Sequence, residues 1–235
     1  MNPVVFIGYD PREECAYEVA CKSIRRHCSE PDLQIKALRL DSLKAMGILN
    51  RPIERRDGKL WCPISQAPMA TEFAISRFSV PFLVGGGWAL FCDSDVLCRA
   101  DIADLFALAN PKYAVMVVKH NYQPKETVKM DGQVQTQYSR KNWSSVMLFN
   151  CDHPGNRNLT LQVLNTWPGR DLHAFKWIED SEIGELPDKW NHLVGVTQSP
   201  IDEASLLHYT NGGPFLSGWQ GGPADDLWLS EKVYE

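Results

Sequence analysis

Short apolar runs recur along the chain and alternate with segments of helical character. The runs cover residues 4–7, 34–40, 88–92, 113–118, 145–150 and 206–209, and their length and bulk predict strands. Helical spacing or composition marks residues 10–27, 69–78, 159–167 and 225–234. The opening order of strand, helix, strand predicts an α/β fold with a mostly parallel, Rossmann-like central sheet flanked by helices.

The remaining stretches carry weaker signals. Residues 119–142 are polar and indicate an excursion or a hairpin, whereas residues 186–191 indicate a loop. Residues 42–68 hold a basic cluster, which predicts either a solvated loop or an arm that reaches phosphates. The cluster consists of Arg51, Arg55, Arg56 and Lys59.

Two helix starts are marked by capping residues. Asp10 stands before Pro11, with Glu13 two residues further on, which is typical of an N-cap followed by proline and an acidic third position. Asp101 and Asp104 mark a second start in the same way. The second start lies just after the apolar run at 88–92, so a buried strand, an acidic loop and a helix follow one another there.

Composition limits the classes of protein to which the chain can belong. Its 235 residues are 44% hydrophobic and 23% charged, which predicts one globular domain over residues 1–235. The net charge of −5 and the absence of a long basic run argue against nucleic acid as a partner. We find no signal peptide and no membrane span. The seven cysteines lack C-x-x-C spacing, so we expect reduced core thiols and a cytoplasmic protein.

The acidic pair after the 88–92 run is the strongest candidate for chemistry. Asp93 and Asp95 are two positions apart, so at strand spacing both side chains point the same way. Two carboxylates at the carboxyl end of a buried strand suit Mg²⁺ or Mn²⁺ that also binds phosphates. The alternative is that Asp95 only ends the strand and Asp93 is a solvated loop residue.

Residues further along the chain have structural alternatives of their own. His208 ends the last predicted strand and precedes Gly212 and Gly213, whose small size would let backbone N–H groups approach phosphates. Without a ligand, His208 is a hydrogen-bonded histidine at a strand end.

Together these pieces resemble glycosyltransferase family 8, the group of GT-A-fold enzymes that contains glycogenin and bacterial lipopolysaccharide galactosyltransferases. The resemblance covers nearly the whole chain. It rests on a strand ending at Tyr9 and Asp10, the Ser76 to Phe78 helix, the acidic motif at 91–97 with the helix at 101–106, and the late loop at 208–214. The acidic motif is its most specific part.

The resemblance implies a metal-dependent transfer of sugar from a nucleotide sugar, with a UDP-sugar as the expected donor and a glycan or lipid-linked acceptor. It implies that Asp93, Asp95 and His208 hold Mn²⁺ or Mg²⁺. The residues it places near the donor are Tyr9 and Asp10 at the base and ribose, Ser94 at the ribose, Arg77 at the sugar, Trp143 and Ser144 beside the sugar, and Asp180 near the anomeric carbon.

One departure from the family concerns the diphosphate. The family's late loop carries a lysine that meets the diphosphate, but Pro214 and Phe215 occupy that region here. We therefore expect Gly212 and Gly213, together with Lys141 as a displaced cation, to replace it. Three of these residues have a purely structural alternative. The alternative for Lys141 is a solvated lysine at a strand start, the one for Arg77 is a surface helix residue, and the one for Asp10 is a helix cap alone.

Two other functions remain open at this stage. A nucleotidyltransferase also uses acidic metal ligands, but it begins with a basic glycine-rich loop, which residues 8–13 do not form. A catalytically silent nucleotide-sugar binder would keep the fold and lose the phosphate lysine. For the enzyme, we expect the polar 119–142 segment to lie over the site and to help select the acceptor. Of the tryptophans, Trp219 lies in a glycine-rich loop and is the one we expect to contact the acceptor.

Overall fold

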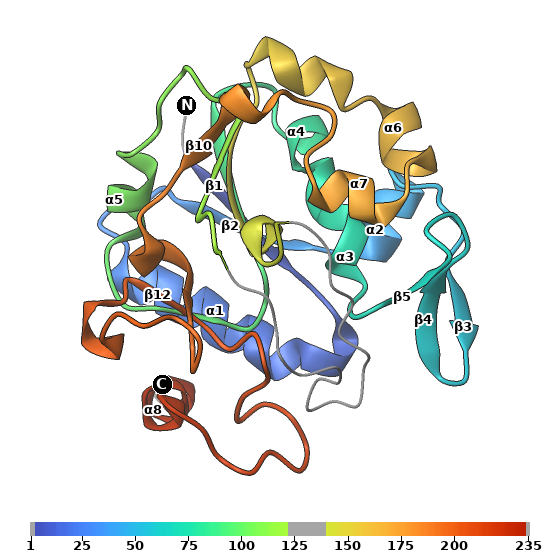
Figure 1. The fold of residues 1–235 in the computed structure, drawn as a ribbon. Coiled ribbons are helices and arrows are strands. Elements are labelled where there is room, and N and C mark those ends of the chain that lie inside the picture. Colours follow the sequence, from blue (N-terminus) through green and yellow to red (C-terminus); the bar gives the residue numbers. More distant parts are fainter. Residues whose placement is uncertain (1–2, 122–139, 234–235) are drawn as a thin grey trace.

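The computed structural model describes residues 3–121 and 140–233, and its centre is a six-stranded sheet (Figure 1). In order across the sheet, the strands are β10 (Ile183–Glu185), β8 (Val115–Val117), β9 (Val146–Asn150), β6 (Trp88–Cys92), β1 (Val4–Gly8) and β2 (Gln34–Leu38). All neighbours pair in parallel except β9, which is antiparallel to both β6 and β8. The predicted mixed α/β architecture with a mostly parallel sheet is confirmed.

Helices cover both faces of this sheet because its inner strands are apolar on both sides. Along β1, Val5 and Ile7 face a core that includes α1 (Glu14–His27) and α5 (Ile102–Phe106). Val4 and Phe6 face the opposite core. That core takes side chains from α2 (Leu40–Ala45), α3 (Phe73–Ser76), α4 (Val80–Leu83), α6 (Leu161–Thr166) and α7 (Gly169–His173). The C-terminal helix α8 (Asp225–Val233) packs against α1 through Trp228, which is fully buried.

Both predicted helix starts are confirmed. The side chain of Asp10 accepts a hydrogen bond from the Arg12 N–H at 3.0 Å, and Pro11 opens a 3₁₀ turn that leads into α1. Asp101 caps α5 by accepting from the Ala103 N–H at 2.9 Å. The helix after Asp10 ends at His27, where the pattern ends it too.

Two smaller sheets flank the central one. The first joins β11 (His192–Leu193), β12 (Leu206–His208) and β7 (Val96–Cys98), and the second is the antiparallel set β3 (Glu54–Arg56), β4 (Lys59–Cys62) and β5 (Ala67–Met69). Short 3₁₀ turns complete the fold at Pro11–Glu13, Arg77–Ser79, Trp143–Ser145, Pro154–Asn158, Asp180–Glu182, Asp188–Asn191 and Ile201–Glu203. Among residues 3–121 and 140–233, no helix is long and apolar enough to cross a bilayer.

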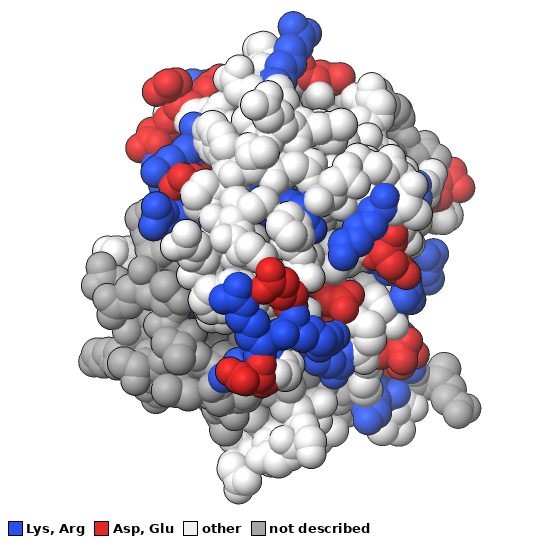
Figure 2. Space-filling view, turned by 90° about the vertical axis from the view of Figure 1, so that its right-hand side faces the viewer, with Lys and Arg blue, Asp and Glu red and all other residues white. Residues whose placement is uncertain are grey.

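Residues 42–78 differ most from the prediction. Of the helix expected over 69–78, only α3 and the start of the 3₁₀ turn that follows it are helical, and Met69 belongs to strand β5 instead. The helix α4 begins only after that turn. Arg51 is not a solvated residue: its side chain is buried and donates to the carbonyls of Leu164 and Trp167 at 2.7 and 2.8 Å. The rest of the basic cluster is exposed on the β3–β4 hairpin, and on the face in Figure 2 basic side chains are mixed with acidic ones.

All seven cysteines are free, as predicted. Cys62, Cys92 and Cys98 are buried, and the other four are partly buried. Most of the 119–142 segment lies outside the described residues, so its proposed place over the site stays a prediction.

Candidate active site

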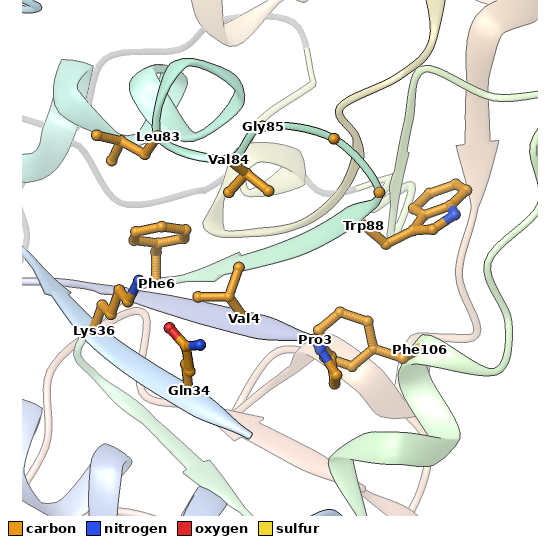
Figure 3. Close-up of a pocket in the computed structure, with 12 residues that line it drawn as sticks. Pro3, Val4, Phe6, Gln34, Lys36, Leu83, Val84, Gly85, Trp88 and Phe106 are labelled. Atoms are coloured by element: carbon orange, nitrogen blue, oxygen red, sulfur yellow. The ribbon is translucent and has the colours of Figure 1, made fainter. Parts of the chain in front are cut away.

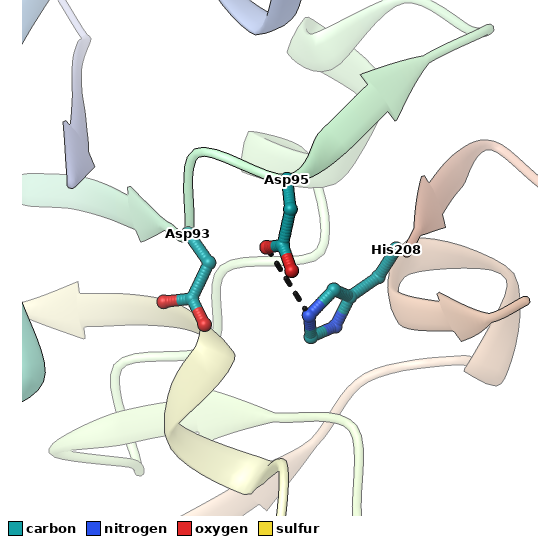
Figure 4. Close-up of side chains that lie close together, drawn as sticks. All are labelled: Asp93, Asp95 and His208. Carbon is teal, nitrogen blue, oxygen red and sulfur yellow. Dashed lines mark ion pairs between the residues drawn. The ribbon is translucent and has the colours of Figure 1, made fainter. Parts of the chain in front are cut away.

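Strand pairing brings the predicted metal ligands together although 113 residues separate Asp95 from His208. Asp93 directly follows β6, and Asp95 directly precedes β7. Strand β12 runs antiparallel to β7 with His208 opposite Val96, and the Tyr209 N–H donates to the Asp95 carbonyl at 2.9 Å. Ligand atoms of Asp93, Asp95 and His208 consequently lie within 4.8 Å of one another, and Figure 4 shows the three side chains converging.

The donor set fits a hard divalent cation. Two carboxylates and one imidazole suit Mn²⁺ or Mg²⁺ with further positions left for phosphate oxygens. His208 Nε2 lies 3.3 Å from Asp95 Oδ1, and its Nδ1 lies 2.9 Å from Asn191 Oδ1. The nitrogen nearer to the carboxylates is therefore the one that would complete a metal site.

Glu13 adds a third carboxylate, which the sequence analysis assigned only to the helix start. Its side chain turns inward and accepts a hydrogen bond from Ser94 Oγ at 2.9 Å. Burial and, after it, the negative charge of Asp95 together raise the pKa of Glu13 to about 7. The concentration of acidic groups around Asp95 favours a bound cation, which independently supports the metal-ligand interpretation.

Arg77 balances part of this charge. It is buried, with its guanidinium 2.9 Å from Asp93 Oδ1 and donating to the Ser144 carbonyl at 2.8 Å. The same group lies over the rings of Phe73 and Phe91 at 5.5 and 5.1 Å. Arg77 is therefore no surface helix residue, and its first structural role is to hold Asp93 in place.

A cavity of about 270 Å³ opens beside these groups. Six of the residues singled out in the sequence line it: Arg77, Asp93, Asp95, Lys141, Ser144 and His208. Further lining residues come from β5, α3 and α7, and α7 contributes Arg170 and His173, which the sequence analysis missed. Ser144 Oγ and His173 Nδ1 are 2.7 Å apart. This hydrogen bond joins α7 to the segment that follows Lys141.

Lys141 is held in the cavity wall by an unusual backbone. Arg140 and Asn142, on either side of it, both have left-handed φ angles of 63°. The Lys141 side chain is only 7% exposed, so the solvated-lysine interpretation is wrong for this residue. Arg140 anchors the turn by donating to the Ala174 carbonyl at 2.5 Å.

Other predicted residues do not reach the cavity lining. The side chain of Asp180 is 83% exposed and pairs with Arg140. The cavity is lined by residues of α7 and not by the 180–182 turn. The Gly212 N–H donates to the Tyr209 carbonyl at 2.8 Å and is committed to a turn. Gly213 is buried against Phe215, to which a Cβ at that position would come within 2.8 Å. The predicted roles of Asp180, Gly212 and Gly213 stay predictions that this geometry does not support.

The residues expected at the base and ribose are held by protein contacts. The Tyr9 hydroxyl donates to Glu14 at 2.9 Å, and the Arg39 guanidinium carbon lies 3.5 Å from the Tyr9 ring centroid. Burial acts to raise the pKa of Asp10, but hydrogen bonds from the Arg12 side chain and backbone and from the Glu72 N–H outweigh it and hold the pKa low. Their roles toward the nucleotide stay predictions.

Three further candidates also have structural partners. Ser94 is fully buried, and its hydroxyl donates a hydrogen bond to Glu13. Trp143 Nε1 donates to the His120 carbonyl at 3.0 Å. Trp219 Nε1 donates to Asp225 at 2.6 Å, which fixes the loop in which we expected an acceptor contact.

A second hollow, of about 690 Å³, lies at the opposite edge of the sheet. Figure 3 shows Val4, Phe6, Lys36 and Trp88 around it, near the amino ends of β1, β2 and β6. None of the predicted site residues lines it. The candidate chemistry is therefore confined to the cavity at the carboxyl ends of the strands, where open α/β sheets bind ligands.

Comparisons with known proteins agree with this geometry. The sequence profile of glycosyl transferase family 8 matches residues 76–214. Protein CDI of Arabidopsis thaliana is 44% identical over 232 residues, which are 97% of this chain and 85% of that protein.

Solved glycosyltransferases share the fold. The apo form of GlyE from Streptococcus pneumoniae TIGR4 superimposes with a TM-score of 0.64 at 16% identity, over 100% of this chain and 61% of GlyE, so this chain spans under two thirds of GlyE. The galactosyltransferase LgtC, solved with donor and acceptor sugar analogues, has a TM-score of 0.56 at 10% identity, over 97% of this chain and 95% of LgtC. These likenesses confirm the predicted GT-A-type fold.

Proposed function

Because the chain belongs to glycosyl transferase family 8, we propose that it transfers a sugar from a nucleotide-sugar donor, with a UDP-sugar as the first candidate, to a glycan or lipid-linked acceptor. The observation that carries the proposal is the convergence of Asp93, Asp95 and His208 at the edge of a cavity. The free cysteines support a reducing, cytoplasmic setting for this activity.

The acidic cavity needs a cation before a diphosphate can enter. A carboxylate and a phosphate about 4 Å apart repel by roughly 4 kcal/mol at an effective dielectric constant of about 20, and Glu13 adds a further acidic group. Asp93, Asp95 and His208 would hold Mn²⁺ or Mg²⁺ here. When bound, the metal supplies Lewis-acid stabilisation of the leaving nucleoside diphosphate.

Lys141 supplies the second positive charge in this proposal. Lys141 lines the cavity and is only 7% exposed, whereas the side chain of Arg170, which also lines it, is 78% exposed. Arg77, another basic residue of the lining, lies against Asp93 and the Ser144 carbonyl. The Lys141 ammonium group would stabilise the charge that develops on the diphosphate as the sugar leaves.

The test is the release of nucleoside diphosphate from a panel of nucleotide sugars, with Mn²⁺ and with a chelator. We expect release from one donor, dependent on Mn²⁺ and lost in Asp95→Asn. Release of pyrophosphate from a nucleoside triphosphate would identify a nucleotidyltransferase instead. Tight donor binding without any turnover, with small sugars and glycans offered as acceptors, would identify a silent binding protein.

A further inference from the structure

Asn191 lies behind the candidate metal ligand His208, and its surroundings fix which way its side-chain amide points. It is fully buried, with Nδ2 at 2.9 Å from Ser145 Oγ and 3.1 Å from the Asn142 carbonyl oxygen. The Ser145 hydroxyl donates its hydrogen to the same Asn142 carbonyl at 2.7 Å, so toward Asn191 it acts as acceptor. Two acceptors on one side require the NH₂ group there, which turns Asn191 Oδ1 toward His208.

The orientation of this amide determines which tautomer the His208 imidazole adopts. Asn191 Oδ1 only accepts hydrogen bonds, and it lies 2.9 Å from His208 Nδ1, so Nδ1 carries the hydrogen. In an uncharged imidazole the other nitrogen then has the free lone pair. That nitrogen, Nε2, is the one that faces Asp95 at 3.3 Å. His208 is thereby presented in the tautomer that can bind a metal ion.

We propose that Asn191 is the positioning residue of this site: it selects the metal-binding tautomer of His208 and is itself held by the turn that carries Lys141. The use of that tautomer for a metal rests on the proposed function. A partner that binds the second nitrogen of a ligating histidine typically accounts for roughly 10- to 100-fold in metal affinity. Asn191 is not among the residues that line the cavity, so its effect on a bound metal is exerted through His208.

Asn142 links the two halves of the site in this proposal. Its carbonyl accepts from both Ser145 and Asn191, and its left-handed backbone, with φ 63°, is a conformation that asparagine tolerates better than most residues. The residue before it is Lys141, which faces the cavity. The orientation of His208 and the placement of the phosphate-binding lysine therefore depend on one short turn.

Nitrogen-15 NMR of the histidine side chains tests the proposal without a metal. Spectra are recorded on the metal-free protein at a pH where imidazole is uncharged, with His208→Gln to assign the signals. We expect Nδ1–H for His208 in the wild type, a mixture of tautomers in Asn191→Leu, and the wild-type tautomer in Asn191→Asp, which keeps an acceptor toward Nδ1. A purely structural role for Asn191 would not move the tautomer in a folded variant.

Titration calorimetry with Mn²⁺ gives the second readout. We expect Asn191→Leu to bind Mn²⁺ roughly 10- to 100-fold more weakly than wild type. The proposal is overturned if wild-type His208 carries its hydrogen on Nε2, or if Asn191→Leu keeps the wild-type tautomer. If wild type binds no Mn²⁺, the proposed function fails, and the tautomer in the wild type and the Leu variant still decides the role of Asn191.

Discussion

Arg77 illustrates how single residues of this site serve structure and chemistry together. It is one of the few buried charges in the described chain, and it pairs with Asp93, a candidate metal ligand. Replacing it with leucine leaves that carboxylate and the Ser144 carbonyl without the guanidinium. Removing one partner of a buried pair typically costs about 3 to 5 kcal/mol. We expect a loss in this range by urea unfolding.

Arg170→Leu is the matched control for that measurement. The Arg170 side chain is 78% exposed and 3.9 Å from Asp171, so its loss should change stability by less than about 0.5 kcal/mol. Equal effects of the two substitutions would show that Arg77 does not stabilise the acidic pair.

Lys141 carries the most specific residue-level prediction. If its ammonium group stabilises the leaving diphosphate, Lys141→Ala should slow donor turnover by a hundredfold or more, or roughly 3 kcal/mol. Lys44→Ala, an exposed lysine on α2, is the matched control. Arg140→Ala is unsuitable because Arg140 anchors the turn through Ala174 and Asp180. A rate within about threefold of wild type, under 1 kcal/mol, would reject the role of Lys141.

The sequence identifies residues whose signal is local and misses those defined by distant contacts. Asp93 and Asp95 form a motif within three positions, so the pair is visible without a structure. Glu13 looks like an ordinary helix-start residue until the fold places it against Ser94. Asn191 has no local pattern at all, because its meaning comes from His208 and Ser145. Asp180 was chosen by resemblance and lies on the exposed side of the Arg140 turn.

At the scale of elements, the short helix α5 follows the metal motif and depends on its cap. Asp101 accepts from Ala103 and also from the Ser29 N–H at 3.1 Å, which ties α5 to the end of α1. We expect Asp101→Ala to lower the free energy of unfolding by about 1 kcal/mol near neutral pH. Urea unfolding measures this loss, and Asp226→Ala on α8 is the exposed control.

The same substitution has a defined pH dependence. Hydrogen bonds from Ser29 and then from Ala103 hold the pKa of Asp101 below its ordinary value, despite partial burial. A carboxyl group with a lowered folded pKa stabilises the protein above its unfolded pKa and loses that contribution as the pH falls through the folded pKa. The difference between wild type and Asp101→Ala should therefore shrink in acid. If the difference in unfolding free energy between wild type and Asp101→Ala stayed constant from neutral pH into acid, the Asp101 carboxylate would not be the group that caps α5.

Strands were predictable where an apolar run is continuous, and less predictable where strand pairing determines their direction or their existence. Strands β1, β6 and β9 were recognised because each is an uninterrupted apolar run. The antiparallel direction of β9 was not, because a strand buried on both faces has the same pattern in either direction. The β3–β5 hairpins were missed because their strands are only three or four residues long, which is too short for an alternating pattern to stand out.

At the scale of the whole molecule, partly buried histidines should make the protein sensitive to acid. Burial and, after it, the nearby positive charge of Arg77 together lower the pKa of His173 to about 3. The unfolded chain, with a histidine pKa of about 6.5, binds the proton more readily. Stability is then complete above about pH 6.5 and falls as the pH drops toward the folded pKa, with about 2 kcal/mol lost by about pH 5.

His173→Gln tests this assignment. We expect the variant to lose less stability than wild type between about pH 7 and about pH 5, as measured by urea unfolding at each pH. His120, whose pKa burial lowers to about 4, remains in both proteins and contributes equally. Parallel pH profiles for wild type and variant would show that His173 is not the group responsible.

The overall topology explains why the candidate metal ligands meet at one cavity. Strands β6 and β12 come from different sheets and distant parts of the sequence, yet the pairing of β12 with β7 places His208 across from the acidic loop. The cavity then lies at the carboxyl ends of the parallel strands, and α7 contributes to its lining. The order of elements made this location predictable, whereas the identity of the wall residues required the structure.

The central claim is that Asp93, Asp95 and His208 bind a divalent cation that in turn binds the nucleotide. Its most direct test is titration calorimetry of UDP into the protein with and without Mn²⁺, in wild type, Asp95→Asn and the exposed control Asp226→Asn. The account predicts tight binding to wild type and Asp226→Asn only when Mn²⁺ is present, and loss of that Mn²⁺-dependent binding in folded Asp95→Asn. Mn²⁺-dependent affinity for UDP that is unchanged in Asp95→Asn would contradict it.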